Sequence, residues 1–156
     1  MIALQERFDI SRYLGKWYEV YRSKNISFEG EKVIDNYSLV EPNKIRVDFS
    51  QEKNGKPETG IGSARIDPQN PAKWYQKFEL NWFIKLFTFD YSVLATDYDN
   101  YAIVYSRNRF FFFFTREWIW VMSRNQELNP KLTEQCFEII RQRTGFKKED
   151  FHKTQH

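Results

Sequence analysis

The chain has 156 residues, of which 41% are hydrophobic, so we expect a single domain, 1–156, with one closed core. Aromatic residues make up 19% of it, against only 6 Gly and 5 Pro, which excludes a disordered or collagen-like chain. Lys and Arg number 24 and Asp and Glu 21, so the net charge is +3. That excess is too small to indicate a nucleic-acid partner by itself.

We expect neither a membrane-spanning segment nor a secretory signal in the chain as given. The most apolar stretch, residues 110–114, is too short to cross a bilayer, and Arg107, Arg109 and Arg116 flank it. The first residues show no basic segment followed by an apolar one. Cys136 is the only cysteine, which fits a reducing compartment without requiring one. A cytoplasmic or membrane-peripheral location is expected unless an upstream signal was removed.

In chain order, the sequence first predicts a series of β-strands joined by turns. The segment 45–52 alternates apolar and polar residues almost without error, and turn signals such as Pro42-Asn43 and Asp99-Asn100 separate the segments. The strands are expected at 15–24, 31–40, 45–52, 60–66, 73–80, 89–97, 101–106 and 116–124. Such a meander must form a sandwich or close into a barrel to remove its free edges.

One α-helix is predicted after the strands, at 130–143. Asn129 is placed as its N-cap and Pro130 at its first position. Leu132, Cys136 and Ile140 fall at helical spacing, so an apolar stripe is expected to pack on the outside of the sheet. The polar tail, 147–156, is expected to be loosely held.

Three short motifs identify a family resemblance. They are Gly15-Lys16-Trp17 on the first strand, Thr96-Asp97-Tyr98 between two late strands, and Arg124 at the end of the last. In this order they resemble the signature of the lipocalin family, and the sequence around them is similar to the apolipoprotein D-like branch with its bacterial and temperature-induced members. The resemblance runs from about residue 8 to 155 and implies an all-β, eight-stranded antiparallel up-and-down barrel, about 13–124, with one C-terminal helix outside.

Physical chemistry gives these motif residues a structural role. Trp17 is expected to point into the barrel near its closed end, where the Arg124 guanidinium can lie over the indole and bond to nearby carbonyls. The Asp97 turn tightens the neighbouring hairpin. Because no titratable groups converge with them, we expect a plug of the barrel floor and no chemistry.

An eight-stranded barrel has room for one small ligand, and aromatic walls favour an apolar one. Strand alternation predicts which side chains point inward, although each of them could instead fill a core. These candidates are Val33, Tyr37, Ile45, Val47, Phe49, Trp74, Phe78, Leu80, Trp118, Trp120 and Met122. Resemblance to apolipoprotein D favours Tyr37, Phe78, Tyr91, Trp120 and Met122 as ligand contacts. It implies transport or sequestration of a fatty acid, a lysophospholipid or a sterol-like molecule.

Two connections are unusually apolar for loops, and in a lipocalin both lie at the open mouth of the barrel. Adjacent side chains of an extended chain face opposite sides, so consecutive Phe residues cannot all point inward. We expect contact with a membrane, whose anionic head groups would suit the nearby Arg residues, or with a second subunit, or closure of the mouth as a lid. The residues are Trp82, Phe83, Ile84, Phe87, Phe110, Phe111, Phe112, Phe113 and Phe114.

The sequence offers little reaction chemistry, so we expect no catalytic residue, no cofactor and no metal. Cys136 is placed on the helix as a buried apolar residue, unlike the thiolate that prostaglandin isomerases of this family carry inside the barrel. His152 and His156 lie in the tail, where no triad or zinc site is expected. Glu19 and Asp35 could orient a ligand from inside the barrel, but we expect them to face solvent.

The sequence also bears on two alternative functions and two alternative locations. A lipid-modifying enzyme of the same fold would return its bound lipid changed. A single-stranded nucleic-acid binder is disfavoured because the sequence has no RNP-type motif and no concentrated basic stripe. Secreted relatives carry paired cysteines and bacterial anchored relatives a lipobox cysteine, and this chain has neither feature, which argues against both locations.

Overall fold

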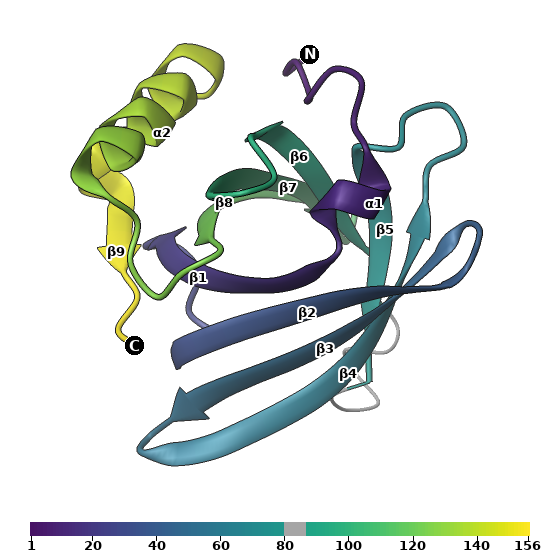
Figure 1. The fold of residues 1–156 in the computed structure, drawn as a ribbon, viewed down its shortest axis with the longest axis horizontal. Helices are drawn as coiled ribbons and strands as arrows, with labels where there is room; N and C mark the ends of the chain where they lie inside the picture. Colours follow the sequence, from purple (N-terminus) through teal and green to yellow (C-terminus); the bar gives the residue numbers. More distant parts are fainter. Residues whose placement is uncertain (80–86) are drawn as a thin grey trace.

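Eight antiparallel strands wind into a closed barrel in the computed structural model, which describes residues 1–79 and 87–156 (Figure 1). The strands are β1 (Gly15–Ser23), β2 (Glu31–Glu41), β3 (Lys44–Lys53), β4 (Lys56–Ile66), β5 (Lys73–Phe78), β6 (Phe89–Thr96), β7 (Tyr101–Phe110) and β8 (Phe114–Ser123). Each pairs with its neighbour in sequence, and β1 pairs with both β8 and β2, which closes the barrel. The predicted up-and-down barrel is confirmed.

The floor of the barrel is closed by Trp17, as the first motif predicts. A short helix, α1 (Ile10–Tyr13), crosses this end (Figure 1), and the Trp17 indole Nε1 donates to the Tyr13 carbonyl at 2.8 Å. Arg124 lies over the indole, with its guanidinium carbon 3.8 Å from the ring centroid. Gly15 has a φ of 97°, and a Cβ there would lie 3.4 Å from Arg124 Nη1. Glycine therefore suits both the backbone and the space at this position.

The Thr96-Asp97-Tyr98 motif forms the tight turn between β6 and β7. Asp97 Oδ1 accepts hydrogen bonds from the backbone N–H groups of Asn100 (2.8 Å) and Tyr101 (3.0 Å). Thr96 Oγ1 donates to the Tyr101 carbonyl at 2.6 Å. Tyr98 then takes a left-handed φ of 69° and presents its carbonyl to Arg124 Nε at 2.9 Å. This turn and the floor are thus joined through one guanidinium.

Helix α2 (Pro130–Arg143) packs on the outer surface of the barrel, as predicted. Asn129 Oδ1 caps it by accepting from the Leu132 N–H at 2.9 Å. Its inner face is formed by Cys136, Phe137 and Ile140, which join the outward-facing apolar residues of β1, β6, β7 and β8 in a second core. Burial raises the pKa of the Cys136 thiol to about 12, so this cysteine is not a reactive thiolate at neutral pH.

The C-terminal tail is ordered, and the expectation of a loosely held tail was wrong. After the 3₁₀ turn η2 (Lys148–Asp150), strand β9 (Phe151–Lys153) pairs antiparallel with residues 21–23 of β1 (Figure 1). The reason lies in β1, which pairs with β2 only as far as Tyr18, so its later edge is left for β9. Phe151 also packs its ring against Phe137 of α2, at 5.2 Å between centroids.

Candidate ligand-binding cavity

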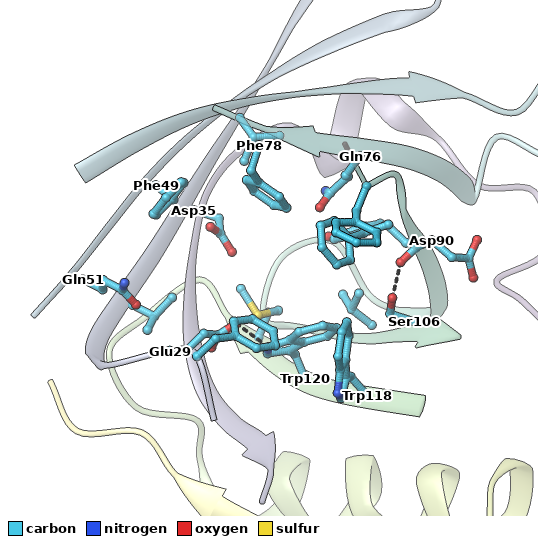
Figure 2. A pocket seen from close by; sticks show the side chains of 18 of the residues that line it. Glu29, Asp35, Phe49, Gln51, Gln76, Phe78, Asp90, Ser106, Trp118 and Trp120 are labelled. Atoms are coloured by element: carbon cyan, nitrogen blue, oxygen red, sulfur yellow. Dashed lines mark hydrogen bonds between the residues drawn. The ribbon is translucent and has the colours of Figure 1, made fainter. Parts of the chain in front are cut away.

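The barrel encloses a cavity of about 380 Å³ above its floor (Figure 2). Its lining comes from inward-facing side chains of β2, β3, β5, β6, β7 and β8, from the segment between β1 and β2, from Phe87 before β6 and from Phe111 at the β7–β8 turn. All seven residues that the sequence placed in the ligand site lie on this wall: Tyr37, Phe49, Phe78, Tyr91, Trp118, Trp120 and Met122. The structure therefore brings together side chains from five different strands around one space.

Two of the predicted lining residues lie below the cavity. Ile45 and Trp74 are fully buried in the floor core, where Trp74 stacks on Tyr91 at 4.7 Å and meets Tyr13 edge-on at 5.5 Å. Alternation along a strand identifies the inward face but not the height along the barrel axis, which explains the error. Leu80, a further candidate, lies outside the described residues.

Asp35 points into the cavity between Phe49 and Phe78 (Figure 2), and the expectation that it faces solvent was wrong. It shares a strand face with Tyr37, two residues on, so the pleat of β2 directs both side chains inward. Burial raises the pKa of Asp35 to about 7, the nearby Glu29 carboxylate adds to this rise, and a hydrogen bond with Tyr37 opposes it. A carboxyl group that titrates near neutral pH therefore lies on an apolar wall.

Three tyrosine hydroxyls meet at the inner end of the cavity, below Asp35. The hydroxyl oxygens of Tyr13 and Tyr91 are 2.5 Å apart, and Tyr37 interacts with both Tyr91 and Asp35. Burial raises the pKa values of Tyr37 and Tyr91 well above the ordinary value, so both phenols are neutral donors. The inner end of the cavity therefore carries a cluster of neutral hydroxyl groups beside the Asp35 carboxyl group.

Glu29 forms a second polar position on the wall, one that the sequence did not predict. Its Oε1 accepts a hydrogen bond from Trp120 Nε1 at 2.9 Å, while its Oε2 is buried without a hydrogen-bond partner and lies 3.9 Å from Arg22 Nη1. Glu29 belongs to the irregular segment between β1 and β2, where alternation gives no signal.

Behind Glu29, Arg22 also faces Glu19 (3.1 Å) and Glu31 (3.7 Å). Glu19 is fully buried, so its expected solvent-facing placement was wrong as well. Burial, followed by the nearby Glu29, raises the pKa of Glu19 well above its ordinary range. Thr154 of the tail donates to Glu19 Oε2 at 2.5 Å, which explains why this carboxyl group is covered rather than exposed.

Aromatic side chains also line the outer end of the cavity. Phe28 packs against Trp118 at 5.2 Å between ring centroids, and Phe87 contacts Phe110 (5.6 Å) and Phe111 (6.4 Å). These residues belong to the same lining as the predicted ligand contacts. Trp82, Phe83 and Ile84, which the sequence placed at the mouth, lie outside the described residues.

The five-Phe run forms the tip of the β7–β8 hairpin, because both strands are longer than predicted and pair as far as Phe110 and Phe114. We call residues 111–114 the Phe tip. Phe112 is 83% exposed and Phe113 is 85% exposed. Phe111 and Phe112 have left-handed φ values of 51° and 63°, a conformation that favours Gly or Asn over a bulky aromatic residue. Turn formation therefore does not explain the choice of Phe here.

The described residues offer no arrangement typical of catalysis. Cys136 lies outside the barrel, under α2, and the tail histidines contact Glu31 (His152, 2.6 Å) and the Glu19 carbonyl (His156, 2.6 Å). In the part of the chain that the structure describes, no group of three or more His, Cys, Asp or Glu is placed to hold a metal ion. Over residues 1–79 and 87–156, no helix has the length and apolar character needed to span a bilayer.

A closed eight-stranded barrel with a plugged floor, an apolar cavity and a helix outside is the architecture of a lipocalin. Solved structures with this fold include insecticyanin from the tobacco hornworm Manduca sexta, with a TM-score of 0.81 and 22% identity over 100% of this chain and 85% of that one. Lobster apocrustacyanin A1 has a TM-score of 0.78 and 22% identity over 94% of this chain and 78% of the other.

Sequence comparison identifies the family. Residues 8–156 match the family model of the lipocalin-like domain, and the chain belongs to the lipocalin family. Its relatives include apolipoprotein D from Rattus norvegicus, 36% identical over 130 residues that cover 82% of this chain and 67% of the relative. Apolipoprotein D from Oryctolagus cuniculus is 38% identical over 141 residues, 88% of this chain and 71% of the relative. The predicted apolipoprotein D-like resemblance is confirmed, and lipocalins are binding proteins for small hydrophobic molecules.

Proposed function

We propose that the protein binds one lipid-like molecule in the barrel cavity and transports or sequesters it. The observation that carries this proposal is the cavity itself: about 380 Å³, closed at the floor and walled mostly by aromatic and aliphatic side chains. An enclosed apolar space of this kind removes most of a small ligand's surface from water. The seven lining residues named above are the proposed ligand contacts.

A cavity-filling variant tests this proposal. Val104 lies on the cavity wall, opposite Trp120 in the β7–β8 pairing. In Val104→Phe the added ring occupies ligand space, so we expect the affinity for decan-1-ol to fall by about tenfold or more. Quenching of tryptophan fluorescence reports binding, since Trp118 and Trp120 line the cavity.

The matched control for this variant is Val40→Phe. Val40 is 51% exposed on β2 and does not line the cavity, so its replacement should leave the affinity for decan-1-ol unchanged. Equal affinity of the wild type and Val104→Phe, with both proteins folded, would mean that the ligand binds elsewhere.

We propose in addition that the Phe tip docks on a membrane surface beside the open mouth. Four consecutive exposed aromatic residues are a large apolar patch for a soluble surface, and the strained backbone at Phe111 and Phe112 favours a functional reason for them. The Arg109 guanidinium donates to the Phe112 carbonyl at 3.0 Å, and Arg107 and Arg116 lie on the adjoining strands. Positive charge beside the tip would attract the anionic head groups of a membrane.

Co-sedimentation with vesicles tests the docking. We expect the wild type to bind phosphatidylcholine vesicles that contain a quarter phosphatidylglycerol, and the double variant Phe112→Ser, Phe113→Ser to bind about tenfold more weakly. Leu39→Ser, Val40→Ser is the matched control, because both residues are exposed and apolar on β2, away from the tip.

Two results would contradict the membrane proposal. Equal vesicle binding by the wild type and the Phe-tip variant would show that the Phe tip does not contact the membrane. A wild type that is a dimer by size-exclusion chromatography, with a monomeric Phe-tip variant, would make the tip a subunit contact instead.

A further inference from the structure

The cavity has charged groups of only one sign among the described residues that line it. Its ionisable carboxyl groups are Glu29, Asp35 and Asp90, and no Lys or Arg from residues 1–79 and 87–156 is part of the lining. Asp90 turns its carboxylate away from the cavity (Figure 2), toward Lys73, 3.5 Å from Oδ1. Glu29 and Asp35 therefore set the charge of the interior.

The nearest described cation, Arg22, is shared among several carboxyl groups and lies outside the cavity lining. Arg22 Nη1 lies 3.9 Å from Glu29 Oε2, but the same guanidinium faces Glu19 and Glu31 and donates to the Gly30 carbonyl. Glu29 Oε2 remains buried without a hydrogen bond. A positive charge that enters the cavity would stabilise a carboxylate held in this way, because the low-polarity surroundings strengthen the attraction between them.

We propose that the cavity selects a long-chain aliphatic amine, with Asp35 as the counter-ion of its protonated amino group at the inner end. This inference rests on the proposed lipid-binding function and names the head group that the cavity favours. The aliphatic chain would lie along Phe49, Phe78 and Trp118 toward the mouth, and Glu29 would add a second negative charge beside the path.

The same arrangement disfavours an ionised fatty acid. A carboxylate placed at the inner end would meet Asp35 and Glu29 with no cation in the described lining, and like charges in an apolar space repel strongly. The affinity of a neutral alcohol should lie between those of the amine and the carboxylate. Its hydroxyl group can donate to Asp35 or accept from one of the three tyrosine hydroxyls at the inner end.

The amine should bind more tightly as the pH rises through the titration of Asp35. The groups that interact with Asp35 are Glu29 from the segment before β2, Tyr37 on β2 itself and Tyr13 from α1, and Tyr91 from β6 contacts both of these phenols. All three phenols are neutral in this range, so Asp35, whose pKa is raised to about 7, gains negative charge between pH 5.5 and 8; the pKa of Glu19 is also raised, but Glu19 is not part of the cavity lining. The alkyl amine stays protonated over the same interval.

Isothermal titration calorimetry with decylamine, decan-1-ol and sodium decanoate tests the inference, since these probes share one chain. At pH 8 we expect decylamine to bind about tenfold or more tightly than decanoate, with decan-1-ol between them. Lowering the pH to 5.5 should weaken decylamine binding and strengthen decanoate binding.

Asp35→Asn keeps the shape of the side chain and removes its charge. We expect this variant to lose about tenfold in decylamine affinity at pH 8 and to lose most of the pH dependence, while decan-1-ol still binds. Asp48→Asn is the matched control, because Asp48 lies on the outer face of β3, paired with Arg46 at 2.9 Å. It should behave as the wild type.

The outcomes separate the inference from the function on which it rests. If decan-1-ol binds but decylamine binds no more tightly than decanoate, or Asp35→Asn keeps the decylamine affinity, the head-group inference is wrong and the lipid-binding function stands. If none of the three probes binds, the proposed function fails and the inference fails with it.

Discussion

Arg124→Ala is expected to lower the free energy of unfolding by about 3 kcal/mol and the melting temperature by about 10 °C. The guanidinium donates to four backbone carbonyls, those of Arg12, Tyr13, Lys16 and Tyr98, at 2.8 to 3.2 Å. It also covers the Trp17 indole. Its removal would take this donor from the carbonyls of Arg12, Lys16 and Tyr98, leave the Tyr13 carbonyl with the Trp17 indole alone, and uncover a buried ring at the floor.

Two variants make this measurement specific. Arg124→Lys retains the charge but not the planar fork of donors, so it should recover less than half of the lost stability. Arg141→Ala removes an exposed arginine that pairs with Glu138 on α2 and should cost less than about 0.5 kcal/mol. Thermal unfolding followed by circular dichroism measures all three. An Arg124→Ala protein as stable as Arg141→Ala would show that the floor does not depend on this residue.

Asp35→Asn is expected to make the folded protein more stable than the wild type, and increasingly so as the pH rises. The pKa of Asp35 is raised to about 7 in the folded state, whereas the pKa of an unfolded aspartate is about 3.9. Folding therefore disfavours the ionised carboxylate. The resulting loss of stability begins above about pH 4, grows as the pH rises and is complete above about pH 7.

The size of this effect follows from the pKa difference. A shift of about three units corresponds to about 4 kcal/mol, and water that enters the cavity screens part of it, so we expect about 2 kcal/mol at pH 8. Urea unfolding at pH 5 and pH 8 measures the difference between Asp35→Asn and the wild type. A difference that does not widen between these two pH values would contradict the buried placement of Asp35.

The control variant, Asp48→Asn, should change the stability in the opposite direction. The pKa of Asp48 is lowered by its hydrogen bonds and ion pair with Arg46, so its ionised form is the one that the fold favours. Asp48→Asn should therefore be slightly less stable than the wild type at pH 8, a small effect because the pair is exposed. Comparing the two variants separates a buried carboxyl group from a surface one.

Several features of the site could be predicted because they depend on local rules. Alternation on β3 and β8 placed Phe49, Trp118 and Trp120 on one face, and the structure puts all three on the cavity wall. Family resemblance added Tyr91, which also lies there. Height along the barrel was not predictable, so Trp74 was assigned to the cavity although it lies in the floor.

The burial of two carboxyl groups could not be predicted from the sequence either. Glu19 and Asp35 were expected in solvent because isolated acidic residues are rarely buried. Arg22 is close to Glu19 in sequence, but Thr154, which covers the carboxyl group, lies 135 residues away along the chain. A partner as distant as Thr154 leaves no mark in the local sequence around Glu19.

By itself, the sequence determined the strands, the outer helix and the motif residues of the floor, since side-chain alternation, capping and the Gly-x-Trp and Arg pattern act over short distances or through family identity. Only the tertiary structure decided that the tail pairs with β1, that the Phe tip is a tight exposed hairpin, and that the cavity lining holds carboxyl groups without a cation among the described residues. The physical reason is that barrel closure brings distant segments together, and burial and charge are properties of that assembly rather than of any one strand.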